Sequence, residues 1–340
     1  MPSSITADHP LALTMGEPAG VGSEITLKAW RARHTENLPP FVALADLKVL
    51  AMADKALGLA TPIKAVSSPR EALAVFADAL PVLPMDAGGA VTFGQPSPQT
   101  ADAVIRSISE AVRLAASGAV SGVVTNPIQK SVLYDAGFKH PGHTEFIADL
   151  VGAQERPIMM LAIPGLRVVP LTVHIPLARV PASLTTAHII DTGRRVLAAL
   201  RRDFAIATPR LAVAGLNPHA GEGGALGREE IDVIAPAVAA LQSQGWAVTG
   251  PHSPDSLFSA AARAGYDAAL CMYHDQALIP LKALDFERGV NITLGLSIVR
   301  TSPDHGTALD IAGRGLASAE SLIAALHTAR CIAGHRQARS

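Results

Sequence analysis

The stretch Leu11-Ala-Leu-Thr-Met-Gly-Glu-Pro-Ala-Gly-Val-Gly22 begins as a continuous apolar run and ends as a glycine-rich turn. The run Leu11–Met15 predicts a strand that is covered on both faces. The turn leads into a helix that we expect to begin near Ser23. Along the rest of the chain, short apolar runs alternate with longer segments of helical period, which is the pattern of βαβ units around a mainly parallel sheet.

The other predicted strands are also short and largely apolar: Phe41–Ala45, Val120–Thr125, Ile158–Ile163, Val168–Val173, Leu211–Gly215 and Ala268–Met272. Two amphipathic helices are predicted over Thr100–Ala116 and Thr186–Arg202, because their apolar residues recur on one stripe. No internal repeat or low-complexity linker interrupts this alternation. The sequence therefore predicts the α/β class.

The composition sets further bounds. A length of 340 residues predicts roughly two domains with ample core. With 49% hydrophobic and 17% charged residues, the chain is neither disordered, collagen-like nor a coiled coil. The 28 Lys and Arg residues balance 29 Asp and Glu, a net charge of -1, so no global field would hold nucleic acid or an anionic membrane. We expect neither as a partner.

The cellular setting is predicted from cysteines and apolar runs. Cys271 and Cys331 are too few for a disulfide framework and are expected to be reduced thiols. Every apolar run is broken well before about 18 residues, the minimum for a membrane span. The first twenty residues show no signal-peptide pattern. We expect a soluble, cytoplasmic protein.

Several polar segments follow predicted strands directly, at the edge of an open α/β sheet where ligands bind. The first is the glycine-rich turn itself, whose backbone N–H groups and following helix suit a phosphate or carboxylate. It lacks the GxGxxG pattern, since Ile25 stands where the third glycine would be. A plain strand-to-helix turn is the alternative interpretation.

A second polar segment is Lys139-His-Pro-Gly-His-Thr-Glu145. His143 and Thr144 are placed at the start of a predicted helix. Thr144 is a candidate helix cap and a lone histidine is usually structural. Two histidines, a threonine and a glutamate around one Pro-Gly turn also suit a binding site, so both interpretations stay open.

Three histidines occupy equivalent positions beyond predicted strands: His174, His219 and His274. They are 45 and 55 residues apart, so there is no local metal motif, but strand ends can converge at one sheet edge. Three neutral imidazoles suit Zn2+ or Co2+ better than Mg2+. Each histidine alone would more often pack or cap; the equivalence of the three favours a metal site. Glu222 adds a carboxylate beside His219.

Cationic side chains suggest a site for a small anion. Lys282, Arg300, His143 and His140 are candidates for a pocket that holds a phosphorylated or carboxylated molecule, with Asn291 nearby in sequence. Arg300 ends an apolar stretch, where a solvated position is less expected. The final motif, from Arg300 to Gly315, is dense in hydrogen-bonding groups that suit a nucleotide. The residues by themselves predict a metal-assisted reaction on a small anion.

The chain resembles the PdxA family of pyridoxal phosphate biosynthesis over nearly its whole length. Six segments carry the resemblance in the right order: TMGEPAGVG, PGHTEF, LNPHAGEGG with the following GREEID, MYHDQALIPLK, GVNITLGL and RTSPDHGTALDIAGRG. The resemblance implies two α/β/α domains like those of the isocitrate and isopropylmalate dehydrogenases, and a homodimer whose active site lies in the interdomain cleft at the dimer interface. The domains expected are 1–128 with 302–340, and 129–301.

The activity implied by the resemblance is NAD(P)-dependent oxidation of 4-phosphooxy-L-threonine at C3, followed by decarboxylation. The implied metal ligands are His174, His219 and His274, one of them from the neighbouring subunit, around Zn2+, Co2+ or Mg2+. The implied substrate contacts are His143, Thr144, Lys282, Asn291 and Arg300. The segment from Asp304 to Gly315 resembles the cofactor loop of isopropylmalate dehydrogenases, so NAD+ or NADP+ is expected at Asp304, His305, Gly306, Thr307 and Asp310. Asp275 is a candidate general base.

Some positions depart from the family pattern without removing an implied ligand: Ser23, Gln129, Ala277 and Ser297. Relatives that oxidise phosphorylated threonate or erythronate provide an alternative substrate. A dihydrodiol of terephthalate fits less well, since the anion-binding set is intact. A non-catalytic module that binds a metabolite is the alternative from another functional class.

Overall fold

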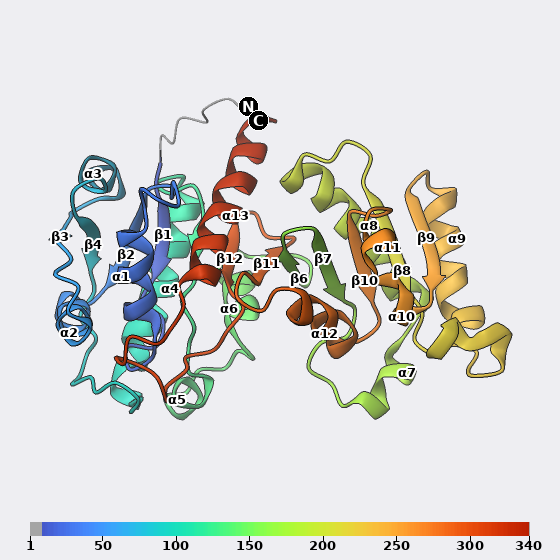
Figure 1. Cartoon of the computed structure of the whole chain (residues 1–340), viewed down its shortest axis with the longest axis horizontal. Helices are drawn as coiled ribbons and strands as arrows, with labels where there is room; N and C mark the ends of the chain where they lie inside the picture. The colour runs from blue at the N-terminus through green and yellow to red at the C-terminus, as the bar shows by residue number, and fades with distance from the viewer. Residues whose placement is uncertain (1–8, 340) are drawn as a thin grey trace. The chain divides into compact units, whose positions relative to one another are not determined.

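The computed structural model describes residues 9–339 of the chain. By their internal contacts these residues form two compact units. Unit 1 contains the described residues up to Pro157 together with Leu296–Ala338, and unit 2 contains Ile158–Gly295. Both units are coloured along the chain in Figure 1.

Unit 1 is built on a wholly parallel set of strands in the order β3-β4-β2-β1-β5-β12. The bounds are β1 (Leu11–Thr14), β2 (Phe41–Ala45), β3 (Ile63–Ala65), β4 (Leu80–Pro84), β5 (Val123–Val124) and β12 (Arg300–Pro303). Leu11 is aligned with Phe41 in the register of β1 and β2. Both of these strands are buried along their whole length, as expected for parallel strands covered on two faces.

Helices cover both faces of the unit 1 sheet. They are α1 (Gly22–Arg31), α2 (Leu47–Leu57), α3 (Pro69–Val75), α4 (Ala101–Ala116), α5 (Lys130–Asp135), α6 (His143–Leu150) and α13 (Glu320–Gln337). Val104 and Ile108 of α4 share one core cluster with Ala12 and Val42 from the sheet. Figure 1 shows α1 and α13, which contact each other, over a face of the same sheet. The stripe predicted for α4 is the one that is buried.

Unit 2 contains the strands β11-β6-β7-β10-β8-β9 in that order. The bounds are β6 (Ile158–Ile163), β7 (Leu166–Pro170), β8 (Arg210–Ala214), β9 (Ala247–His252), β10 (Ala268–Cys271) and β11 (Val290–Leu294). The pairs from β7 to β9 are parallel, whereas β6 is antiparallel to both of its neighbours. The predicted mainly parallel arrangement is therefore correct, with an antiparallel portion that the sequence pattern did not reveal.

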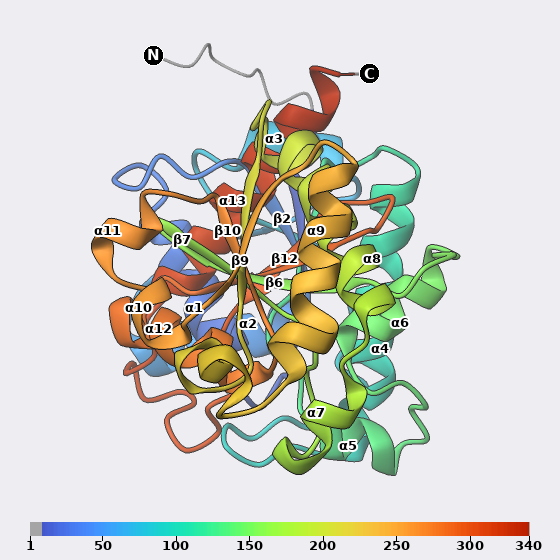
Figure 2. The same cartoon turned by 90° about the vertical axis from the view of Figure 1, so that its right-hand side faces the viewer.

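The helices of unit 2 also lie on two sides of its sheet. They are α7 (Val180–Ser183), α8 (Thr186–Phe204), α9 (Ala235–Ser243), α10 (Pro254–Leu257), α11 (Ala260–Arg263) and α12 (His274–Leu284). Figure 2 shows α8 and α9 on one side of β9, with α10 and α12 on the other. Ala277 and Leu281 of α12 pack in a core cluster with Val168 and Ala269 of the sheet.

The predicted strands Phe41–Ala45 and Ile158–Ile163 are confirmed at both ends. Two other predictions were wrong at their ends. Only Val123 and Val124 of the predicted Val120–Thr125 are strand, and β7 occupies Leu166–Pro170 instead of Val168–Val173. Val120 and Leu171 are apolar and buried although they lie outside the strands, so hydropathy alone extended both predictions.

The unit boundaries differ from the domains expected from the sequence. The chain passes from unit 1 to unit 2 after Pro157 and returns at Leu296, whereas the sequence placed these points after 128 and 301. Residues 129–157 belong with unit 1 because Phe146 and Ile147 of α6 pack in the same core cluster as Val104. Composition gave no signal of this packing.

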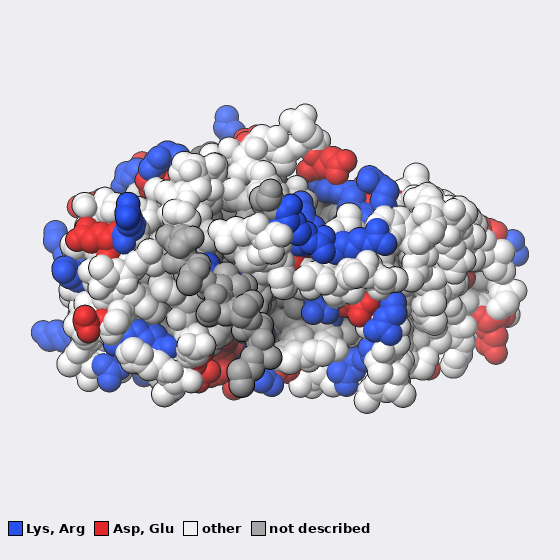
Figure 3. Space-filling view, turned by 90° about the horizontal axis from the view of Figure 1, so that it is seen from above, with Lys and Arg blue, Asp and Glu red and all other residues white. Residues whose placement is uncertain are grey.

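The structure also bears on the predictions about membrane-spanning segments and cysteines. Within residues 9–339, no helix is long and apolar enough to span a bilayer. Cys271 and Cys331 are both free thiols, as predicted. Most of the face drawn in Figure 3 carries neither basic nor acidic side chains, and the charged ones gather in small groups.

Candidate active site

The glycine-rich turn and the final motif lie side by side in unit 1. The backbone N–H of Val21 donates to the carbonyl oxygen of Thr307 at 3.0 Å. A Cβ on residue 20 would lie 2.9 Å from that same oxygen, and real Cβ atoms do not approach so closely. Gly16 has φ +70°, and its Cβ would lie 2.6 Å from the Cβ of Asn126. Gly20 thus allows the close approach of the final motif, and Gly16 that of the segment at Asn126.

Helix α1 fixes the end of the final motif through a buried carboxylate. Glu24 accepts hydrogen bonds from the backbone N–H groups of Gly315 and Ala317, at 3.3 and 3.0 Å. Lys28 donates to Glu24 at 2.8 Å and also to the carbonyl oxygens of Gly315 and Ala317. Because Glu24 is only 1% exposed, this network holds the backbone firmly in place.

The residues expected to bind a nicotinamide cofactor lie along this loop. Asp304 donates its backbone N–H to Ser321, and Thr307 donates its hydroxyl to Gln129 Oε1 at 2.9 Å. The Nε2 atom of His305 is buried without a hydrogen-bond partner among the described residues. Gly306 and Asp310 are exposed, and a Cβ on Gly306 would meet only open space. The loop therefore offers both a fixed backbone and uncommitted polar groups.

Glu17, in the glycine-rich turn, is a buried carboxyl group that sequence reasoning did not single out. It is 2% exposed and accepts a hydrogen bond from the backbone N–H of Ala19. Burial raises its pKa above the ordinary value, while the bond from Ala19 acts in the opposite direction. The motif TMGEPAGVG contains this glutamate, so its position in a glycine turn was the available signal.

The polar segment before α6 places His143 and Thr144 as the first two residues of that helix. The N-cap is Gly142, and no side chain caps the helix, so Thr144 does not have the capping role considered from the sequence. His140 lies 3.8 Å from Asp149 and packs against Phe138 and Phe146. This packing favours a structural role for His140.

Arg300 is 3% exposed and lies at the start of β12. Its Nη2 donates to the hydroxyl oxygen of Thr125 at 2.7 Å. Burial lowers the pKa of Arg300 to about 10, and the carboxylate of Glu145 opposes that shift. A guanidinium with such a pKa remains charged near neutrality. It is a cation held inside unit 1, as its position after an apolar stretch predicted.

His143 lies within the field of two cations. Its pKa is well below the ordinary value because of burial, the charge of Arg300 and the charge of Lys130. The imidazole is therefore neutral at pH 7, and its Nε2 is buried without a partner among the described residues. A Cβ on Gly142 would lie 3.5 Å from Lys130 Nζ and 3.7 Å from Glu145 Oε2, so both side chains reach the start of α6.

We call His143, Lys130, Arg300, Thr125 and Glu145 the anion cluster. With neutral His143 it has two cations and one carboxylate, so it carries a net positive charge. Sequence reasoning found His143 and Arg300 but missed Lys130. The signal was its place after a strand in Asn126-Pro-Ile-Gln-Lys130, where a lone lysine resembles an ordinary solvated side chain.

In unit 2, two of the predicted metal ligands lie close together. The imidazole centroids of His174 and His274 are 5.8 Å apart. His274 shares a 2.7 Å hydrogen bond between its Nδ1 and Asp275 Oδ1. This bond orients the ring and leaves Nε2 for a ligand, which is the usual arrangement of a metal-binding histidine. Asp275, the candidate base, is thus paired with an imidazole.

His219 lies on an unusual turn in the same unit. Residues His219 to Gly223 all have positive φ values, between 44° and 78°, which non-glycine residues rarely adopt. Buried Glu230 supports this turn by accepting from the backbone N–H groups of Leu216 and Asn217, each at 2.7 Å. Backbone strain of this kind gathers at functional sites.

Within residues 9–339 no three His, Cys, Asp or Glu side chains converge closely enough to hold a metal ion. His219 instead lies near Asp255, whose pKa is lowered mainly by a hydrogen bond from Ser253 and in smaller part by His219. The three-histidine site therefore stays a prediction.

The remaining substrate candidates are also in unit 2. Lys282 lies on α12 with its Nζ 5.2 Å from the ring centroid of Phe286. Asn291 lies on β11, and its Oδ1 is buried without a partner among the described residues. The five substrate candidates thus divide between the units, with His143, Thr144 and Arg300 in unit 1.

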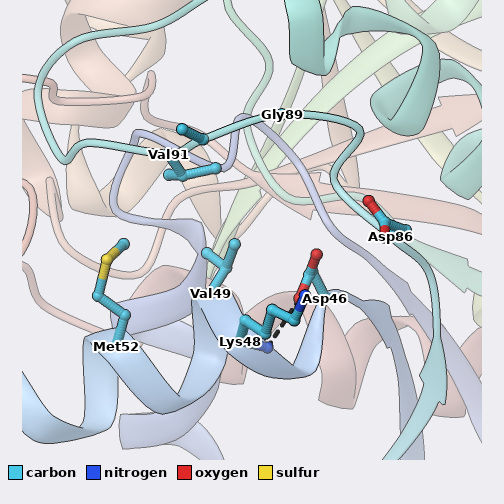
Figure 4. Close-up of a pocket in the computed structure, with 8 residues that line it drawn as sticks. Asp46, Lys48, Val49, Met52, Asp86, Gly89 and Val91 are labelled. Atoms are coloured by element: carbon cyan, nitrogen blue, oxygen red, sulfur yellow. Dashed lines mark hydrogen bonds between the residues drawn. The ribbon is translucent and has the colours of Figure 1, made fainter.

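A pocket of about 290 Å³ in unit 1 is lined by other residues. Figure 4 shows Lys48, Val49 and Met52 of α2 opposite the loop that carries Asp86 and Gly89. The carboxylate of Asp46 has a structural role here, because it accepts hydrogen bonds from the backbone N–H groups of Lys48 and Ala87. None of the predicted site residues lines this pocket, and we assign no ligand to it.

The fold and these clusters define an α/β protein of two units, with a buried imidazole beside two cations in unit 1 and two neighbouring imidazoles in unit 2. The chain belongs to the family described as pyridoxal phosphate biosynthetic protein PdxA, whose model matches residues 36–329. It is 57% identical over 333 residues to 4-hydroxythreonine-4-phosphate dehydrogenase of Caulobacter vibrioides, covering 96% of this chain and 98% of the relative.

Solved structures agree with this assignment. The crystal structure of 4-hydroxythreonine-4-phosphate dehydrogenase from Klebsiella pneumoniae matches with a TM-score of 0.82 and 37% identity, over 96% of this chain and 99% of that one. A terephthalate 1,2-cis-dihydrodiol dehydrogenase from Burkholderia xenovorans matches with a TM-score of 0.62 and 28% identity, over 94% and 97%.

Proposed function

We propose that the chain is a dehydrogenase that oxidises 4-phosphooxy-L-threonine at C3 with NAD+ or NADP+. The hydroxyl on C3 would lose its proton and carbon C3 would transfer a hydride to the nicotinamide, giving 2-amino-3-oxo-4-phosphooxybutanoate and reduced nicotinamide. The 3-oxo acid then loses CO2 and takes up a proton, giving 3-amino-2-oxopropyl phosphate. The relatives named above, similar over nearly their whole length, support this activity.

The observation that carries the proposal is the anion cluster of unit 1. A buried guanidinium, a lysine and a neutral imidazole with an uncommitted Nε2 suit a phosphate group. His143, Thr144 and Arg300 would bind and orient the phosphorylated substrate, together with Lys282 and Asn291 of unit 2. These five residues would contribute by orienting the substrate, so that C3 is correctly placed for the reaction.

The residues of the final motif fit a nicotinamide nucleotide. The backbone of Thr307 is fixed against the glycine-rich turn, while Gly306 is open and His305 holds an unpartnered Nε2. We assign Asp304, His305, Gly306, Thr307 and Asp310 to this group. When bound, the nicotinamide supplies the hydride acceptor.

The histidines of unit 2 fit part of a divalent metal site. Two imidazoles on one tetrahedral ion have ring centroids roughly 5 Å apart, close to the 5.8 Å between His174 and His274. His219 would complete the set, with one of the three ligands supplied by the neighbouring subunit of a homodimer. Such an ion, Zn2+, Co2+ or Mg2+, supplies a Lewis acid that stabilises negative charge on the substrate oxygen.

Turnover assays test this proposal directly. The purified protein should reduce NAD+ or NADP+ with 4-phosphooxy-L-threonine, and His219→Ala should lose both turnover and bound metal. A higher kcat/KM for 4-phosphoerythronate would transfer the assignment to the sugar-acid phosphate dehydrogenases. Binding of the phosphorylated substrate without any nucleotide reduction would identify a non-catalytic binding module.

A further inference from the structure

In unit 2 the three candidate metal ligands follow three strands that are adjacent in the sheet. His174 lies beyond β7, His274 beyond β10 and His219 beyond β8, and β10 pairs with both of the other strands. The carboxyl ends of these strands therefore position the backbone from which the three histidine side chains project. Any side chain that fixes these ends relative to one another also fixes the histidines.

Two buried side chains join the three strand ends. The backbone N–H of Met272 donates to Gln276 Oε1 at 2.7 Å, and Gln276 Nε2 donates to the carbonyl oxygen of Gly215 at 2.7 Å. On the other side, Thr172 Oγ1 donates to the carbonyl oxygen of Met272 at 2.7 Å. We call Thr172, Met272, Gln276 and Gly215 the strand-end link.

Two of the three hydrogen bonds in the strand-end link are long-range, spanning 61 residues from Gly215 to Gln276 and 100 from Thr172 to Met272. Thr172 is 7% exposed and Gln276 8%, while Met272 is fully buried. Hydrogen bonds in such a setting are strong, and a lost partner leaves a buried polar group unsatisfied. The geometry at these positions is therefore well determined.

We propose that Gln276 and Thr172 are positioning residues that hold the backbone near His174, His219 and His274 so that each imidazole can bind a divalent cation. This inference rests on the proposed function, which assigns those histidines to a metal. Met272 lies two residues before His274 in sequence, and both its N–H and its carbonyl are held by side chains of the link. Metal ligation tolerates ligand displacements of only about 0.2 Å, so a loosened strand end weakens binding.

The test compares four variants of the full-length protein, one of them Thr172→Ser, which keeps the hydroxyl. Gln276→Met removes both bonds of the amide at similar volume, and Thr172→Val removes the hydroxyl alone. Tyr266→Phe is the matched control, since its buried hydroxyl donates to the carbonyl oxygen of Leu257 at 3.0 Å just before β10 begins. Zn2+ and Co2+ affinities are measured by titration calorimetry, with the Co2+ absorption spectrum as a report of ligand geometry.

We expect Gln276→Met and Thr172→Val to raise the Kd for either metal by about tenfold or more and to change the Co2+ spectrum. Tyr266→Phe should bind as the wild type does, and Thr172→Ser should restore the wild-type affinity. Thermal unfolding of the metal-free proteins shows that each variant is folded. If Gln276→Met does not fold, the comparison of Thr172→Val with Thr172→Ser decides alone.

Wild-type affinity and spectrum in both Gln276→Met and Thr172→Val would overturn the positioning role while leaving the metal site intact. Equal losses in Tyr266→Phe would also overturn it, because the effect would then reflect general stability. If the wild-type protein binds neither Zn2+ nor Co2+, the metal assignment in the proposed function fails together with this inference.

Discussion

The guanidinium of Arg300 donates a 2.7 Å hydrogen bond from Nη2 to the hydroxyl of Thr125. Thr125 is fully buried just after β5, and its backbone N–H donates to the carbonyl oxygen of Thr301. The threonine therefore fixes the guanidinium of a cation that burial alone would disfavour. If Arg300 binds the phosphorylated substrate as proposed, Thr125 should influence substrate affinity through this hydrogen bond.

Thr125→Val should raise KM for the phosphorylated substrate about tenfold, because the hydrogen bond that orients a charged group contributes about 1.4 kcal/mol or more. The effect on kcat should be smaller. Thr125→Ser keeps the hydroxyl and should stay near the wild type. Steady-state kinetics of the three proteins decide the matter; an unchanged KM in Thr125→Val would show that Arg300 is held by other contacts.

Lys130→Met should weaken binding of the phosphorylated substrate by about tenfold, since it removes one of two cations near His143. Lys130→Arg keeps the charge and should retain most of the affinity. Calorimetric Kd values at low and high salt give the measurement, and the difference between the variants should shrink as salt rises. Equal affinities in Lys130→Met and the wild type at low salt would remove Lys130 from the anion cluster.

Binding of a phosphorylated substrate should be accompanied by proton uptake at His143. The pKa of this imidazole is lowered by burial, Arg300 and Lys130, so it is neutral in the free protein. A bound phosphate dianion favours the charged imidazole and raises that pKa. Titrations near about pH 6 in buffers of different ionisation enthalpy should reveal the uptake.

His143→Asn should abolish this proton uptake, whereas His140→Asn should preserve it, because His140 packs among aromatic rings. Uptake that persists in His143→Asn would assign the proton to another group. In the absence of ligand, the lowered pKa of His143 also has a stability consequence. The unfolded state binds the proton more readily, so stability is lost as pH falls below the ordinary value of 6.5.

Glu17→Gln should raise Tm at pH 7. Burial raises the pKa of Glu17 above 4.5, so ionisation is disfavoured in the folded state. The protonated Glu17 side chain therefore contributes to stability. This contribution is complete below pH 4.5 and is lost as pH rises through the folded-state pKa. The Tm difference between Glu17→Gln and the wild type should therefore grow with pH and vanish in acid.

Glu110→Gln is a control for Glu17→Gln, because the pKa of Glu110 is shifted in the opposite direction. The Arg113 side chain lowers the pKa of Glu110 by hydrogen bonding to it. Its small contribution is present above the ordinary pKa and lost in acid, so Glu110→Gln should be equal to or slightly less stable than the wild type at pH 7. Parallel curves for the two variants would refute the role of burial at Glu17.

The fold was largely predictable because buried parallel strands leave continuous apolar runs such as Phe41–Ala45. Strand direction was not, since the run Ile158–Ile163 has the same apolar character but pairs antiparallel. The assignment of residues 129–157 to unit 1 depends on how Phe146 packs, and long-range packing has no local sequence signal.

The candidate site was predictable where residue type and position coincide. Arg300 after an apolar stretch and His143 in a polar turn were found for that reason. Lys130 was missed because in the sequence it resembles an ordinary surface lysine. Gln276 was missed because it resembles an ordinary helix residue until its tertiary hydrogen bonds are known. Within residues 9–339 His219 does not converge with the other two histidines, so the three-histidine site remains a prediction from the sequence.

The discontinuity of unit 1 has a consequence for synthesis of the protein. Its sheet includes β12, which pairs with β5, and α13 contacts both β12 and α1. Ribosomes deliver these two elements after all of unit 2 has emerged. The first unit to appear is therefore the last to be finished, and nascent chains carry an open sheet edge at β5 throughout translation of unit 2. Such an edge is where we expect chaperone protection to matter most.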